Sequence, residues 1–107
     1  MKSLLLCLLF TVAFQNHDYN IGEVLKNARQ LTNDSVTVRI TGYVTKNLGG
    51  TIYMFEDRTA GIKVDIDTKF LPAQPFNDKD AVVIQAWVQY ERNKPVTLKV
   101  NRPVTSD

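Results

Sequence analysis

The chain carries two different hydrophobic periodicities, and the change from one to the other lies near Val36. Before that point apolar residues recur at i, i+3, i+4, i+7 and i+10, which gives a helix one apolar face: Ile21, Val24, Leu25, Ala28 and Leu31. Asn20 followed by Glu23 is a capping-box arrangement with Asn as the N-cap residue. The pattern predicts one N-terminal helix that docks its apolar stripe on its own domain.

From Val36 onward, apolar and polar residues alternate with a period of two, as in half-buried strands. The alternation predicts five strands, at residues 36–44, 51–56, 62–66, 81–90 and 96–100. The long connection at residues 68–80 contains Pro72 and Pro75, which exclude a central strand there. Three hairpin-linked strands, a long crossover and two more strands predict an all-β fold: a five-stranded Greek-key barrel of the OB type, with the N-terminal helix capping it.

The first residues form a separate segment. Lys2 precedes an apolar run of 11 residues from Leu4 to Phe14, interrupted only by Thr11. A bilayer span needs about 20 apolar residues, whereas the apolar core of a secretory signal has about 7–15. We therefore expect a cleavable signal peptide at residues 1–15, with cleavage after Ala13 or Gln15, and an OB-fold domain at residues 16–107. The alternative is a buried N-terminal strand or helix of the domain.

This reading places the domain in the periplasm, with no membrane span once the signal is removed. Cys7, the only cysteine, would leave with the signal, which is compatible with an oxidising compartment. The formal charge of +2 would fall to +1, because Lys2 is the only charged residue among residues 1–13. Proteins that bind nucleic acids usually carry a strongly basic face, so this charge argues against a nucleic-acid partner.

The residue inventory also argues against catalysis. A nucleophile needs a base within hydrogen-bond reach, and the only histidine, His17, lies in a polar connector before the helix. Serine occurs in the expected domain only at Ser35 and Ser106, in a turn and in the C-terminal tail. One histidine and no cysteine cannot supply a transition-metal site. We expect a binding protein that is not an enzyme and needs no cofactor.

Strand parity assigns the candidate ligand-binding residues. We expect the apolar residues of the first and third strands, and Tyr53 and Phe55 of the second, to point into the barrel. The outer face then carries a mixed set of side chains: Arg39, Tyr43, Met54, Glu56, Lys63 and Asp65. Asp65 and Asp67 share a face and, with Asp57, are candidates for a weak Ca²⁺ or Mg²⁺ site. A solvated strand face explains Asp65 and Asp67 equally well, and Asp57 is expected to cap its own turn by accepting backbone N–H groups. Trp87 is predicted to point outward on the same face as Val83. It is either packed under the helix or crossover or exposed as a stacking surface for a ligand, and it would form an apolar patch with Val83 if both were exposed.

Several segments resemble the bacterial OB-fold family of small periplasmic proteins that are associated with stress tolerance. They include residues 23–28, the strand at 38–44, Tyr53-Met54-Phe55-Glu56-Asp57 and Gly61-Ile62-Lys63-Val64-Asp65-Ile66-Asp67. Phe70 stands where the family usually has tryptophan, and Ala86-Trp87-Val88-Gln89 replaces its acidic Gly-Glu-Val-Asp run. The resemblance implies an exported binding module with a stress-related role.

We therefore expect a small polar ligand, an envelope fragment or a divalent cation on the outer face. The alternatives are a single-stranded nucleic-acid or oligosaccharide binder, and a protein-interaction adaptor that uses Trp87 and a free strand edge.

Overall fold

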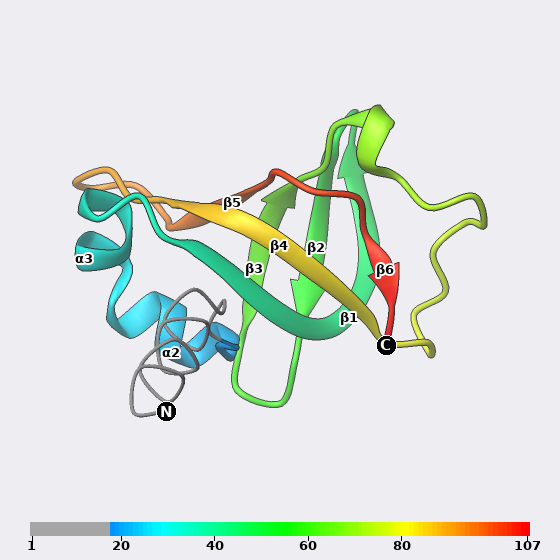
Figure 1. Cartoon of the computed structure of the whole chain (residues 1–107), viewed down its shortest axis with the longest axis horizontal. Coiled ribbons are helices and arrows are strands. Elements are labelled where there is room, and N and C mark those ends of the chain that lie inside the picture. Colours follow the sequence, from blue (N-terminus) through cyan, green and yellow to red (C-terminus); the bar gives the residue numbers. More distant parts are fainter. Residues whose placement is uncertain (1–17) are drawn as a thin grey trace, which may run out of the picture.

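The computed structural model describes residues 18–107, which form two short helices followed by a closed β-barrel (Figure 1). The predicted signal peptide lies outside the described residues. The elements are α2 (Ile21–Lys26), α3 (Ala28–Asn33), β1 (Thr37–Gly49), β2 (Ile52–Glu56), β3 (Gly61–Asp65), the 3-10 turn η1 (Thr68–Phe70), β4 (Val82–Gln89), β5 (Thr97–Val100) and β6 (Thr105–Ser106).

The strands follow the order β1-β2-β3-β5-β4, and pairing between β4 and β1 closes the sheet into a barrel. The β3–β5 pair is parallel, and the other pairs are antiparallel. The two-residue strand β6 adds to β4 at Val82 and Val83. The predicted five-stranded OB barrel is confirmed, with β6 as a short addition.

Strand β1 belongs to both halves of the barrel because it changes partner along its length. Residues 37–42 pair with β4, and residues 43–49 pair with β2. Gly42 lies at the change, where an added Cβ would stand 2.6 Å from the Glu56 carbonyl oxygen and 2.9 Å from Cζ of Phe55. β1 thus continues through residues 46–49, which were predicted to be a turn, and the chain reverses at Gly50 instead, with a φ of +56°.

The core is apolar and draws on every strand from β1 to β5 as well as on the helices. Phe55, the largest fully buried side chain, lies among branched aliphatic residues of the barrel. The inward alternation predicted for β1 and β3 is confirmed by the burial of Val38, Ile40, Ile62 and Val64. In β4, Val83 is also buried, contrary to its predicted outward position, and it lies where β6 pairs with the strand.

The helices cover one end of the barrel, and residues 68–80 lie at the opposite end (Figure 1). The predicted capping box is confirmed: the Glu23 N–H donates to Asn20 Oδ1 and the Asn20 N–H donates to Glu23 Oε1. The predicted single helix is wrong, because the chain breaks at Asn27, whose φ of −113° and ψ of 18° depart from helical values. Leu25 is also off the buried stripe, with 38% of its surface exposed.

No helix among residues 18–107 is long and apolar enough to cross a bilayer.

Candidate functional site

A hollow of the barrel lies where β1 parts from the chain that leads into β4. The last pair between them is Gly42 with Val82. Upstream of Val82, residues 71–78 turn away from β1 and leave a groove of about 790 Å³. We use "the groove" for this space, which is lined by residues 44–47 of β1, Tyr53 of β2, Leu71, Pro72 and residues 74–78.

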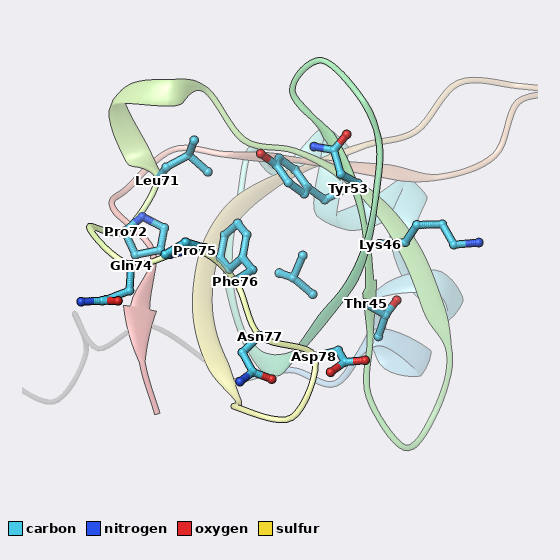
Figure 2. A pocket seen from close by; sticks show the side chains of 12 residues that line it. Thr45, Lys46, Tyr53, Leu71, Pro72, Gln74, Pro75, Phe76, Asn77 and Asp78 are labelled. Atoms are coloured by element: carbon cyan, nitrogen blue, oxygen red, sulfur yellow. The ribbon is translucent and has the colours of Figure 1, made fainter.

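An aromatic pair forms the apolar wall of the groove. Tyr53 is half-buried in β2, and its ring meets the Phe76 ring edge to face, with centroids 5.4 Å apart and an interplanar angle of 73°. Leu71 and Pro72 stand beside Phe76 on the same side of the groove (Figure 2). This wall gives a flat apolar surface of the kind that small-ligand sites use for contact area.

The rim of the groove is polar and almost balanced in charge. Amides come from Asn47, Gln74 and Asn77. Among residues 18–107, the charged side chains that line it are Lys46 and Asp78, and Lys46 points away from the aromatic pair (Figure 2). A neutral rim around an apolar wall suits an uncharged ligand that has both apolar and hydrogen-bonding groups.

The sequence analysis missed this groove because its two walls come from distant segments. Tyr53 was predicted to face the core, and residues 71–78 were read only as a crossover. Pro72, Pro75 and Phe76 are the signal that was available: two prolines and an aromatic ring in a connection of this length are typical of a structured loop over the barrel. Nothing in the sequence shows how far that loop stands from β1.

Four of the seven predicted binding residues share one outer face of the barrel. Met54 of β2 pairs with Lys63 of β3. Lys99 of β5 lies between Asp65 of β3 on one side and Trp87 of β4 on the other. Lys99 Nζ stands 3.9 Å from Asp65 Oδ2, so the basic group of β5 lies beside this acid. The structure therefore brings these side chains together as a partly paired surface, and Lys63 and Trp87 each line a separate hollow at its borders.

The other three predicted residues lie along β1 and the end of β2. Arg39 and Tyr43 line a smaller hollow of about 480 Å³, and Arg39 Nε stands 3.7 Å from Asp18 Oδ1. Tyr43 pairs with Glu56, whose carboxylate accepts a hydrogen bond from Thr45 Oγ1. No predicted binding residue lines the groove, so the assignment of ligand binding to the seven stays a prediction.

Trp87 is 47% exposed on the outside of β4. It borders a small hollow that is also lined by Leu31, Ser35 and Val36, so it lies beside the end of α3 while about half of its surface meets solvent. Trp87 forms no exposed patch with Val83, because Val83 is buried.

One carboxylate outside the groove holds the helices to the barrel. Asp57 Oδ2 accepts the Ile21 N–H at 2.8 Å, and Asp57 Oδ1 accepts the N–H groups of Thr59 and Ala60. Thr59 Oγ1 also donates to Asp57 and accepts the Gly22 N–H at 2.8 Å. Partial burial acts to raise the pKa of Asp57, but these hydrogen bonds outweigh burial and hold the pKa below its ordinary value of 3.8. Asp57 is therefore a structural link rather than a group poised for proton transfer.

Within residues 18–107 the structure contains no group of three or more His, Cys, Asp or Glu side chains arranged to hold a metal ion.

The barrel order, the capping helices and a hollow on the barrel surface define the class: this is an OB-fold protein. Within that class, the chain belongs to the family described as bacterial OB fold (BOF) protein, which it matches over residues 12–103. The resemblance seen in the sequence is thereby confirmed.

Two relatives are informative in different ways. The structure of the hypothetical protein ygiW from E. coli is 25% identical, covers 86% of this chain and 91% of that chain, and superimposes with a TM-score of 0.70. The calcium-regulated OB-fold protein CarO of Pseudomonas aeruginosa is 39% identical over 55 residues, which are 51% of this chain and 47% of CarO. The chain thus matches about half the length of this relative.

A more distant likeness concerns the fold alone. The telomere capping protein Ten1 from Saccharomyces pombe is 15% identical, covers 86% of this chain and 81% of that chain, and gives a TM-score of 0.54.

Proposed function

We propose that this protein is an exported, non-enzymatic binding protein that holds a small, polar, uncharged envelope-derived ligand in the groove. The observation that carries the proposal is the pairing of the Tyr53–Phe76 wall with a rim of amide side chains. The volume of about 790 Å³ falls within the range of about 300–1,000 Å³ that small-ligand sites occupy. Family membership supports a binding role, because the OB barrel is a scaffold on which many ligands are bound.

A cation is a weaker candidate for the ligand. CarO is named as calcium-regulated, which describes that protein. In this chain Asp65, one of the predicted cation ligands, faces the ammonium group of Lys99 at 3.9 Å. A neighbouring positive charge disfavours a bound cation by electrostatic repulsion. The groove itself offers one carboxylate, Asp78, whereas Ca²⁺ takes six to eight oxygen ligands.

A single-stranded nucleic acid is also less well supported than an uncharged ligand. Binding of a phosphate backbone draws on unpaired Lys and Arg side chains. Here Arg39 lies 3.7 Å from Asp18, and Lys99 lies 3.9 Å from Asp65. Trp87 and Tyr43, the aromatic side chains that would stack on bases, lie on separate parts of the surface, beside the end of α3 and in the hollow that Arg39 borders.

Export is proposed from the sequence, on the basis of Lys2 and the apolar run of residues 4–14. Mass spectrometry of the protein from the periplasmic fraction of expressing cells tests it. We expect a chain that begins at residue 14 or 16, and an intact chain confined to the cytoplasm would contradict export.

Thermal unfolding of the purified protein tests the ligand class and the site together. The probes are an N-acetylated disaccharide, the blocked tripeptide acetyl-Ala-Phe-Ala-amide, CaCl₂ and an oligothymidine at low salt. A ligand at about 100 times its Kd stabilises the fold by about 2.7 kcal/mol, which is several degrees for a domain of this size. We expect the disaccharide or the tripeptide to raise the Tm of the wild type.

Two variants locate that effect. In Phe76→Ala the ligand-induced rise in Tm should be lost, because the aromatic wall is removed. In Trp87→Ala, whose side chain lies outside the groove, the rise should persist. The opposite pattern, or a rise produced only by the oligothymidine or by CaCl₂, would overturn the proposal.

A further inference from the structure

The edge of β1 that faces the groove has no strand beside it. On this side β4 pairs with β1 only as far as Gly42 and Val82. Continuing that register would place Tyr43 opposite Ala81 and Val44 opposite Asp80, yet no such pairs form. From Tyr43 onward β1 pairs with β2 alone, on its other side. Residues 43–47 therefore present an open edge, which we call the β1 edge, within the part of the chain that the structure describes.

The chain on the far side of the groove does not form backbone hydrogen bonds with the β1 edge. Residues 71–78 line the facing side of the groove without forming a strand. Outside helices and strands, the backbone hydrogen bonds among residues 18–107 include none between residues 43–48 and residues 71–80. The groove thus separates an unpaired strand edge from a non-repetitive loop, with room between them for a further segment of chain.

An unpaired strand edge is a template for another extended chain. Peptides that bind by strand addition gain affinity from main-chain hydrogen bonds and specificity from pockets that receive alternate side chains. The groove offers both elements: the β1 edge, and beside it the apolar wall of Tyr53 and Phe76. The amides of Asn47, Gln74 and Asn77 can hydrogen-bond the groups of such a peptide that point away from the edge.

The shape of the β1 edge also limits the length of a strand that can pair with it. The β1–β2 register shifts between Val44 and Lys46 and again between Asn47 and Gly49. Such bulges bend a strand, disrupt its ladder and discourage long edge-to-edge pairing. A long strand from a folded partner would meet both irregularities, whereas a segment of a few residues need match only the stretch next to Gly42.

We infer that the ligand of the groove is a short peptide, bound in extended form as an added strand on the β1 edge with an apolar side chain against Tyr53 and Phe76. This inference rests on the proposed function and names the ligand class for the same groove. It assigns the main chain of β1 as the principal recognition element.

The test compares peptides on a single protein, so that a folding defect cannot imitate a loss of binding. Acetyl-Ala-Phe-Ala-amide is titrated into the full ¹⁵N-labelled chain and followed by amide chemical shifts. Two analogues each carry one N-methyl group, at the phenylalanine nitrogen or at the following alanine nitrogen. An added strand directs successive N–H groups to opposite sides, so one analogue should bind at least tenfold more weakly than the other.

The shifts also identify the surface used. We expect the largest changes at the amides of Thr45, Lys46 and Asn47, with further changes at Asn77. Acetyl-Ala-Gly-Ala-amide, which has no apolar side chain, should bind more weakly than the phenylalanine peptide. Phe76→Ala should abolish that difference, and Tyr90→Ala, which changes an exposed ring outside the groove, should preserve it.

Three outcomes would overturn the inference, and they differ in what they say of the proposed function. Equal binding of both methylated analogues at the groove would show recognition by side chains alone, and the proposed function would stand. Binding of the N-acetylated disaccharide in the groove without any peptide binding would also leave the proposed function standing. Failure of both probes to shift groove amides would overturn the inference and the proposed function together.

Discussion

At the scale of single residues, Asp57 has the most clearly defined role in the structure. Its carboxylate joins the first turn of α2, through the Ile21 N–H, to the turn between β2 and β3, through Thr59 and Ala60. The sequence predicted that Asp57 caps its own turn, and that part is confirmed. Its bond to Ile21, 36 positions away in the chain, depends on the docking of the helix and could not be read from local sequence.

Removal of this carboxylate should loosen the contact between helix and barrel. Hydrogen bonds to a charged group contribute about 1.5–3 kcal/mol each in net stability, and unpaired partners add to the loss. We expect Asp57→Ala to lower the free energy of unfolding by about 2–3 kcal/mol in urea denaturation. Asp80→Ala changes an exposed acid of the same type as a control. Equal effects of the two substitutions would contradict the assigned role.

The same carboxylate should give the protein an acid-sensitive component of stability. The pKa of Asp57 in the folded protein lies below its ordinary value, whereas an unfolded chain has a pKa of about 3.9. The stabilisation is therefore fully present above about pH 4 and is lost as the pH falls through the lower, folded pKa. We expect the stability difference between wild type and Asp57→Asn to be constant from about pH 5 to 7 and to shrink below about pH 4. A difference that grows on acidification would be inconsistent with this sign.

At the scale of elements, β1 organises both the barrel and the groove. Its period-two pattern fixed the inward residues up to Val44, and their burial agrees with that prediction. The continuation to Gly49 was not predicted, because glycine and asparagine in residues 47–50 are typical of a turn. Pairing with β2 holds this stretch in the strand despite two shifts of register. The groove follows from that tertiary pairing, which is why the sequence did not reveal it.

At Gly42 the neighbouring residues leave no room for a side chain on β1. Its Cβ would lie 2.6 Å from backbone and 2.9 Å from the buried Phe55 ring. We expect Gly42→Ala to destabilise the fold by about 1–3 kcal/mol, the usual range for overpacking. In Gly61→Ala the nearest atom is the Glu56 Cγ at 3.2 Å, on a flexible, exposed side chain, so its effect should stay within about 0.5 kcal/mol. Similar losses for both variants, measured by urea denaturation, would contradict this explanation.

At the scale of the whole molecule, the two ends of the barrel are covered by different segments. The helices seal one end with Ile21, Val24, Ala28 and Leu31, which join the core. The loop at residues 68–80 lies at the other end (Figure 1), and its residues 71–78 line the groove. The helix stripe and strand alternation were enough to predict this sealed barrel. The position of the binding groove depends on the path of a loop without periodicity, for which the sequence gives only its prolines and Phe76.

Trp87 is the only tryptophan of the chain and reports on the outer face rather than the groove. Its ring is 47% exposed, so iodide should quench its fluorescence strongly in the folded protein. Saturation of the groove with the phenylalanine tripeptide should leave both the emission maximum and the quenching unchanged. Protection of Trp87 from iodide by that peptide would instead place the ligand on the outer face.

The measurement that tests the central claim most directly is a map of amide chemical shifts during titration with the disaccharide and tripeptide probes. The claim is that the ligand site is the space between β1 and residues 71–78. It predicts shifts concentrated at residues 44–47 and 74–78, with the outer-face residues Lys63, Asp65 and Trp87 unaffected. Shifts concentrated at Lys63, Asp65 and Trp87, with the groove unchanged, would contradict it and would return the site to the face that strand parity first indicated.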